Sequence, residues 1–136
     1  MTLETNKQLV RDFYQAIDEK RFDDLGQYVS DDFVFYTQVD TPKPGLSGFI
    51  DSEKASFDAF EEVSFKLNEI VAEGDKVGAY LIFEGRNQLH GTGVIKPSGK
   101  NLRLSLFCLL TIRDGKITEK RAHFDVADAQ AQLATN

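Results

Sequence analysis

The residues best suited to do chemistry lie near the C-terminal end, where Arg121, His123 and Asp125 alternate with apolar residues. Side chains of a β-strand point alternately to its two faces, so a strand over residues 117–125 places these three on one face. A carboxylate flanked by cationic groups is held ionised as a base, and a positioned imidazole donates a hydrogen bond. We therefore predict an acid–base site here. The alternative is a surface charge pattern on a half-exposed strand.

The composition is typical of a single soluble domain spanning residues 1–136, with 41% hydrophobic and 28% charged residues. A net charge of -6 argues against binding to nucleic acid or to an anionic membrane surface. No apolar run approaches the roughly 20 residues of a membrane helix. The polar N-terminus lacks the apolar core of a signal peptide, and Cys108 is the single cysteine. These features favour a cytoplasmic protein without an intrachain disulfide.

The first half of the chain has helical patterns around one strand. Residues 4–19 have apolar residues at helical spacing and Thr5 as a plausible N-cap. A short helix is predicted over 22–29, a strand over 31–37, and a third helix over 48–61. Two prolines mark residues 40–45 as a loop.

The second half reads as strands separated by turns, with predicted strands at 63–72, 77–89, 102–112 and 117–125. In the third of these, the even-numbered residues from Leu102 to Ile112 are apolar and define one face. Residues 127–133 fit a short terminal helix. Helices followed by an antiparallel meander indicate the α+β class, in which the helices cover one face of the sheet.

The spacing of possible metal ligands does not fit a metal site, because the chain has only two histidines and one cysteine. No glycine-rich loop follows a strand and opens a helix, as a phosphate-binding loop would. We therefore expect neither a metal nor a cofactor.

Several segments together resemble one known family, the SnoaL-like polyketide cyclases (ester cyclases) of the nuclear transport factor 2-like superfamily. The similar segments, in chain order, are Asn6–Tyr14, Asp31–Val34, Gly45–Phe49, Ile70–Val77, Pro97–Lys100 and Asp114–Ile117. The resemblance implies a cone-shaped fold, in which a strongly curved antiparallel sheet carries three N-terminal-half helices on its concave face and encloses one deep pocket.

The resemblance also implies a function. Cyclases of this family close a polyketide ring by an intramolecular aldol reaction without metal or cofactor. Their base is an aspartate near the end of the last strand, preceded by a histidine two residues earlier. This pattern matches His123-Phe124-Asp125, so it implies Asp125 as the general base and His123 as the residue that orients it. The alternatives are an Asp125 that caps the terminal helix and a His123 that is a core residue.

Further residues are candidates for binding a ligand. Arg121 would anchor an acidic group of the ligand. The alternative is that Arg121 forms a charge pair with Glu119 on the surface or at a dimer interface. The others are Tyr14, Tyr36, Asn87, His90 and Phe107, and packing is the alternative for the aromatic ones. Which of Asn87, Gln88 and His90 faces the pocket is open.

Three functions from different classes fit the sequence. The first is a cofactor-independent cyclase, isomerase or hydrolase that acts on a hydrophobic carbonyl compound. The second is a module that binds a small apolar ligand without chemistry. The third is a dimerising accessory domain with a vestigial pocket. Since the strand at 102–112 carries Phe107 and Leu109 on its other face, we expect a homodimer packed through the convex side of the sheet.

Overall fold

The computed structural model describes residues 2–91 and 97–134. Its helices are α1 (Leu3–Asp18), the 3-10 helix η1 (Phe22–Gln27), α2 (Leu46–Asp58) and α3 (Val126–Leu133). Its strands are β1 (Val29–Tyr36), β2 (Pro42–Pro44), β3 (Phe60–Glu73), β4 (Lys76–Gln88), β5 (Leu102–Arg113) and β6 (Lys116–His123). Within the described ranges, none of the helices has the length and apolar character needed to cross a membrane.

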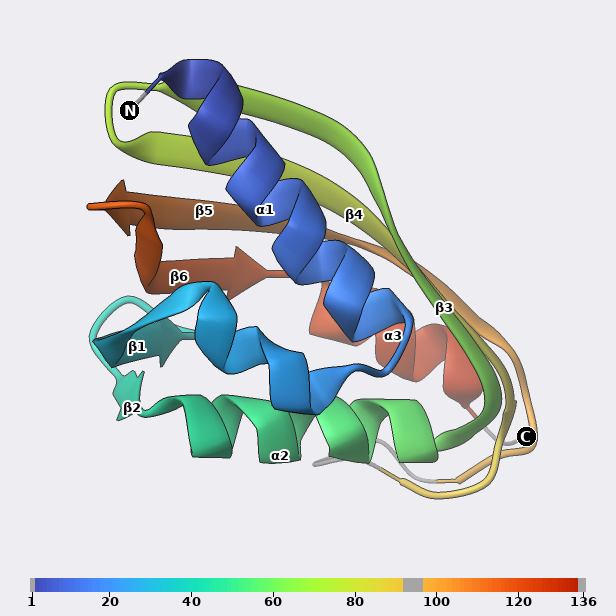
Figure 1. Cartoon of the computed structure of the whole chain (residues 1–136). Coiled ribbons are helices and arrows are strands. Elements are labelled where there is room, and N and C mark those ends of the chain that lie inside the picture. Colours follow the sequence, from blue (N-terminus) through green and yellow to red (C-terminus); the bar gives the residue numbers. More distant parts are fainter. Residues whose placement is uncertain (1, 92–96, 135–136) are drawn as a thin grey trace.

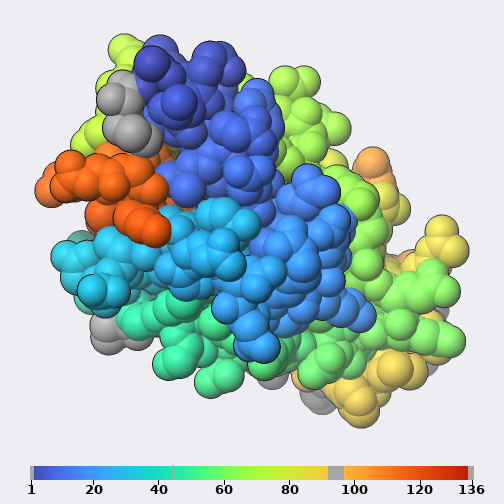
Figure 2. Space-filling view, viewed as in Figure 1, coloured from blue at the N-terminus to red at the C-terminus, as the bar shows by residue number. Residues whose placement is uncertain are grey.

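The six strands form one sheet in the order β2-β1-β6-β5-β4-β3. The sheet curves strongly along β3 and β4, and the helices α1, η1 and α2 cover its concave face (Figure 1). In the space-filling view, atoms of α1 and η1 cover the front of the molecule (Figure 2). The predicted α+β class, with a curved sheet and helices on its concave face, is confirmed. One pair departs from the predicted antiparallel pattern, because β1 runs parallel to β6.

The core lies between this concave face and the helices, and it is dominated by phenylalanine. Phe13 from α1, Phe49 from α2 and Phe33 from β1 are each at most 2% exposed. The Phe49 ring stacks on that of Phe13 and meets that of Phe33 edge-on, with centroid distances of 5.8 Å in both pairs. Aromatic pairs at such distances add to the burial of apolar area that holds the layers together.

Side chains fix both ends of α1. The hydroxyl of Thr2 accepts a hydrogen bond from the backbone N–H of Thr5, so Thr2 is the N-cap where the sequence suggested Thr5. At the other end, the carboxylate of Asp18 accepts hydrogen bonds from the backbone N–H of Phe65 at 2.7 Å and from Lys66 Nζ at 2.5 Å. These charged hydrogen bonds hold α1 across β3.

The terminal helix α3 packs on β5. Its side chain Gln132 accepts a hydrogen bond from the backbone N–H of Arg103 at 2.8 Å and donates one to the Arg103 carbonyl at 2.7 Å. This contact brings Ala129 of α3 to the wall of the cavity described below.

Most boundaries of the elements differ from the sequence prediction by one to three residues, and three differences affect the architecture. The second helix is a 3-10 helix that ends at Gln27, the last strand ends at His123, and a three-residue strand, β2, forms within the predicted loop. The last strand stops early because Asp125 already serves as the N-cap of α3.

Candidate functional site

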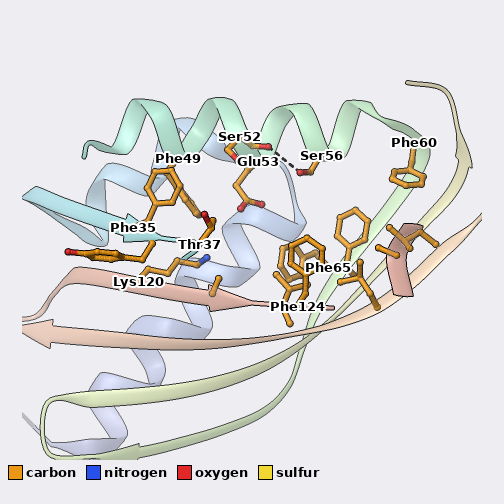
Figure 3. Close-up of a pocket in the computed structure, with 17 residues that line it drawn as sticks. Phe35, Thr37, Phe49, Ser52, Glu53, Ser56, Phe60, Phe65, Lys120 and Phe124 are labelled. Atoms are coloured by element: carbon orange, nitrogen blue, oxygen red, sulfur yellow. Dashed lines mark hydrogen bonds between the residues drawn. The ribbon is translucent and has the colours of Figure 1, made fainter. Parts of the chain in front are cut away.

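A cavity of about 170 Å³ lies between α2 and the inner face of the sheet (Figure 3). Its wall is mostly apolar and consists of Phe35, Phe49, Phe60, Phe65, Phe83, Leu102, Leu104, Leu106, Ala122, Phe124 and Ala129. Polar side chains are few and belong to Tyr36, Thr37, Ser52, Glu53, Ser56 and Lys120. Small-molecule sites typically combine an apolar wall with a few polar groups that orient the ligand. The chemistry of this cavity therefore depends on Glu53 and Lys120, its charged residues.

Glu53 reaches the cavity from α2. It lies four residues after Phe49 and four before Phe57, so the helix places it on the same face as these two buried rings. Its carboxylate points from the helix into the cavity (Figure 3). Burial raises the pKa of the Glu53 carboxyl above its usual range, and the positive charge of Lys120 partly offsets this rise. When ionised, such a carboxylate is a stronger base than an exposed one.

Lys120 reaches the cavity from β6 on the opposite side. Its cross-strand partner on β5 is Leu110, which is fully buried, so both side chains point toward the core. Lys120 is only 5% exposed, and its Nζ lies 5.0 Å from the centroid of the Phe49 ring. A cation above an aromatic face is attracted by the negative charge of the ring.

Glu53 and Lys120 form the polar pair of this cavity without touching each other. Among the described residues, no carboxylate oxygen lies within 4.0 Å of Lys120 Nζ. Lys120 is nevertheless close enough for its charge to lower the pKa of the Glu53 carboxyl. A proton acceptor and a cation on opposite walls of an apolar cavity can act together on a carbonyl group placed between them.

Two serines extend the polar part of the wall along α2. The Ser56 hydroxyl donates a hydrogen bond to the Ser52 carbonyl at 3.2 Å, and both residues line the cavity beside Glu53 (Figure 3). In the part of the chain that the structure describes, no cluster of His, Cys, Asp and Glu side chains could hold a metal ion.

The predicted orientation of the last strand is wrong. The cavity side of this segment carries Lys120, Ala122 and Phe124, whereas His123 is exposed. Ala122 is paired with the buried Cys108, and His123 with Phe107, which is 52% exposed. Cross-strand partners share a face, so the alternation was predicted correctly but the inward face was not.

Asp125 does not line the cavity either. It is exposed, and its carboxylate accepts a hydrogen bond from the backbone N–H of Asp128 at 3.0 Å as the N-cap of α3. This is the capping role that the sequence left as the alternative. His123 and Asp125 are thus adjacent to the cavity segment in sequence but not brought into the cavity. Their catalytic role stays a prediction.

Arg121 and Tyr36 come together, but on the outer side. The Arg121 guanidinium lies 3.8 Å from the centroid of the Tyr36 ring, and its Nε is 3.2 Å from the carboxylate of Glu119. Arg121 also donates a hydrogen bond to the Val39 carbonyl. Although Tyr36 contributes to the cavity wall, its ring is engaged by Arg121. Arg121 thus connects β6 to the segment between β1 and β2.

Tyr14 is buried in the core rather than on the cavity wall. It is 2% exposed, its ring centroid is 6.0 Å from that of Phe65, and its hydroxyl has no hydrogen-bond partner among the described residues. Burial, chiefly, and the neighbouring Cys108 and Glu53 raise the pKa of Tyr14. Its placement supports the packing alternative.

The remaining candidates lie at the far end of β4, and Phe107 lies on the outer face. Asn87 donates a hydrogen bond to the Glu61 carboxylate at 2.8 Å. Gln88 is buried and accepts one from the Ser98 hydroxyl at 3.0 Å. His90 is exposed and lines a second, more open hollow next to α2, which shares only Ser52 and Ser56 with the cavity. None of these residues borders the cavity that contains Glu53 and Lys120.

Sequence reasoning missed Glu53 and Lys120, although both leave a signal in the sequence. Glu53 is the charged residue at helical spacing between Phe49 and Phe57. Lys120 is the charged residue on the strand face that carries Ala122 and Phe124. A charge on an otherwise apolar face is costly unless it is paired or functional.

Comparison with known proteins agrees with this architecture. The sequence model of the SnoaL-like polyketide cyclases matches residues 8–133. The chain belongs to the SnoaL-like polyketide cyclase family. No curated protein matches this SnoaL-like chain.

Solved structures with the same fold are numerous. A SnoaL-like polyketide cyclase from Agrobacterium tumefaciens superposes with a TM-score of 0.81 at 18% identity, over 98% of this chain and 100% of that one. TsrD from Streptomyces laurentii gives 0.85 at 23% identity, over 98% of each chain. AclR from Streptomyces galilaeus, provisionally described as a hydroxylase, gives 0.83 at 18% identity over 97% of each chain. At these identities the likeness shows the fold alone, and a fold does not by itself determine the reaction.

Proposed function

We propose that this SnoaL-like chain is an enzyme that removes a proton next to a carbonyl of a hydrophobic small molecule, using its own side chains. One observation carries the proposal: the Glu53 carboxyl and the Lys120 ammonium group approach one apolar cavity from opposite walls. Membership of a polyketide cyclase family supports a cyclase or isomerase type of reaction.

Glu53 supplies the base. Its carboxylate takes the proton from the carbon next to the carbonyl, and the C–H electron pair moves to form an enolate. The raised pKa of Glu53, which results from burial, brings its basicity closer to what carbon deprotonation at neutral pH requires. The positive charge at Lys120 Nζ stabilises the negative charge that develops on the carbonyl oxygen.

The enolate has two outcomes that need no further reagent. If its carbon attacks a second carbonyl of the same molecule, a C–C bond closes a ring and the new alkoxide takes the proton held by Glu53. If Glu53 returns the proton to a different carbon of an extended enolate, the product is an isomer. The apolar wall selects substrates with substantial hydrocarbon or aromatic surface.

The family pattern assigns the base to Asp125, and this assignment is the competing candidate. The exposed position of Asp125 and its hydrogen bond to Asp128 support a structural role instead. A ligand-binding module without chemistry is the second alternative, since the same cavity would hold an apolar ligand. Variants of Glu53 and Asp125 therefore distinguish the three possibilities, which are Glu53 as the base, Asp125 as the base and a binding module without chemistry.

The experiment follows deuterium incorporation next to the carbonyl of benzylacetone, a hydrophobic ketone, by proton NMR in D₂O. The intact protein should accelerate exchange. Glu53→Gln, which keeps the shape of the side chain, should lower the rate by about 10²–10⁴-fold, whereas Asp125→Asn should leave it unchanged. Loss of the exchange in Asp125→Asn, together with full exchange in Glu53→Gln, would overturn the assignment of Glu53 as the base. Saturable binding of benzylacetone without exchange would favour the binding module.

A further inference from the structure

Lys120 has surroundings that differ from those of an ordinary buried lysine. Its side chain is 5% exposed and lines a cavity whose walls are mainly phenylalanine and leucine. Among the described residues, its Nζ makes no ion pair within 4.0 Å, and it lies 5.0 Å from the centroid of the Phe49 ring. Buried lysines are usually paired with a carboxylate. The amine of Lys120 is instead directed toward the cavity space (Figure 3).

A lysine becomes a nucleophile toward carbonyl compounds where it is held among apolar groups and a proton acceptor stands nearby. The cavity meets both conditions, because Glu53 faces Lys120 from α2. The absence of a direct ion pair matters here, since a carboxylate locked onto the ammonium group would block the approach of a carbonyl carbon.

We infer that Lys120 forms a covalent imine with the carbonyl group of its substrate, so that the cavity accepts aldehydes and ketones and activates them through Lys120 Nζ. This inference rests on the proposed function of the same cavity and extends it. The iminium carries its positive charge at the reacting group itself and is a stronger electron sink than a neighbouring ammonium group.

The step balances without an oxidant or reductant. Glu53 accepts a proton from the Lys120 ammonium group, and the neutral amine attacks the carbonyl carbon. A C–N bond forms, and the C=O electron pair moves to the oxygen, which takes the proton back. The nitrogen, which now carries two hydrogens, passes one proton to Glu53 and regains its lone pair. Glu53 delivers that proton to the hydroxyl, and the lone pair forms the C=N bond as the C–O bond breaks and water leaves. The ammonium form of Lys120 and one carbonyl compound thus give one iminium and one water molecule, with Glu53 ionised again. Glu53 can next remove the neighbouring C–H proton to give an enamine.

Lys54 provides a matched control within the chain. Its Nζ lies 5.9 Å from the centroid of the Phe22 ring, so it also contacts an aromatic face. It is, however, exposed on α2 and does not line the cavity. A reaction that depends on amine–aromatic contact alone would modify both lysines, whereas a reaction that depends on the cavity would modify Lys120.

The test uses two probes and the intact chain. Benzylacetone is added with sodium cyanoborohydride, which reduces an imine to a stable secondary amine, and the labelled residue is located by peptide mass mapping. Acetylacetone is added in a parallel experiment, because its condensation with a lysine gives an enaminone with a new near-ultraviolet absorbance. We expect labelling at Lys120 well above that at Lys54, and loss of the enaminone absorbance in Lys120→Arg but not in Lys54→Arg.

Labelling confined to Lys54 and other exposed lysines, or no labelling, would overturn the inference, and this readout on the unaltered chain does not depend on a variant folding. The proposed function fails differently. Lys120→Arg is first confirmed as folded by circular dichroism. If it keeps the benzylacetone exchange while Glu53→Gln loses it, the inference of imine formation is wrong and the proposed function is supported. If Glu53→Gln keeps the exchange, the proposed function falls.

Discussion

Gly85 lies directly against the ring of Phe60: a Cβ atom added to Gly85 would come within 2.5 Å of that ring. Phe60 is the first residue of β3 and forms part of the cavity wall. Gly85 on β4 therefore determines how close this ring lies to the cavity. Gly85→Ala should displace Phe60 and destabilise the fold by about 1–3 kcal/mol, the range typical of overpacking. Denaturant unfolding measures this.

The control is Gly48→Ala on α2, where an added Cβ meets nothing within 4 Å. Alanine in a helix is favoured over glycine by about 1 kcal/mol, so this variant should be slightly more stable than the parent chain. Equal behaviour of the two variants would show that the contact between Gly85 and Phe60 does not constrain the fold.

The carboxyl of Glu53, a half-buried residue on the cavity wall, should make stability depend on pH. Because burial raises its pKa, the folded state holds a proton that the unfolded state releases. Its contribution is fully present below the carboxyl pKa of the unfolded chain and is lost as the pH rises through the folded value. Glu53→Gln removes that loss, so its melting temperature should exceed that of the parent near neutral pH, with the difference shrinking at acidic pH. Glu62→Gln, exposed on β3, serves as the control. A difference that grows toward acidic pH would contradict the placement of Glu53.

Removal of the positive charge at residue 120 should raise the pKa of Glu53 further. At present, the charge of Lys120 partly offsets the rise caused by burial. In Lys120→Met only burial remains, so the carboxyl carbon resonance of Glu53 should titrate at a higher pH than in the parent chain. Lys54→Met removes an exposed charge on α2, the helix that carries Glu53, and should leave the pH at which Glu53 titrates unchanged. An unchanged titration in Lys120→Met would mean that the two groups do not share the cavity.

The outer face of the sheet should form a homodimer interface. Phe107, Leu109 and Tyr80 are 52%, 40% and 36% exposed on this face, and Val71 beside them is 62% exposed. A contiguous apolar patch on a sheet is usually covered by another layer. Light scattering at micromolar concentration should give twice the mass of the chain. Phe107→Glu should give the monomer, whereas Leu3→Glu, at a 45% exposed residue of α1 on the concave side of the sheet, should not. A monomeric parent chain would contradict this expectation.

The capping role of Asp125 can be measured separately from catalysis. Asp125→Ala removes the acceptor of the Asp128 N–H and should cost about 0.5–2 kcal/mol of unfolding free energy. Asp125→Asn should cost much less, because asparagine is an equally good N-cap. Equal losses in both variants would show that the negative charge, rather than the cap, stabilises α3.

Much of the fold follows from local patterns in the sequence. The alternation from Leu102 to Ile112 correctly identified the inner face of β5, whose even-numbered residues are buried or half-buried. Strand pairing between distant segments was harder. The parallel pair of β1 and β6 depends on how the whole sheet is arranged, and no turn sequence joins these strands to indicate it.

The candidate site was harder to predict for a different reason. The alternation in β6 separates its residues into two sets but does not say which set is buried. The face that carries Arg121, His123 and Asp125 was predicted to point inward because these residues are chemically distinctive, and this prediction is wrong. The pairing of Ala122 with Cys108 resolves the orientation, because Cys108 belongs to the predicted inner face of β5. Such a pairing becomes available only when the register between the two strands is known.

The position of β6 in the sheet also has a consequence for the order of folding during synthesis. The hairpins β3–β4 and β4–β5 join neighbours in the chain and can form as soon as they leave the ribosome, whereas Val29 of β1 must wait for Ile117 of β6. Closing so long a loop is slow. Until it closes, β1 and β2 have no place in the sheet, and the apolar side chains meant for the interior are open to other nascent chains. The segment that contains Lys120 is synthesised after the other strands of the sheet, and it thus both completes the sheet and ends this exposure.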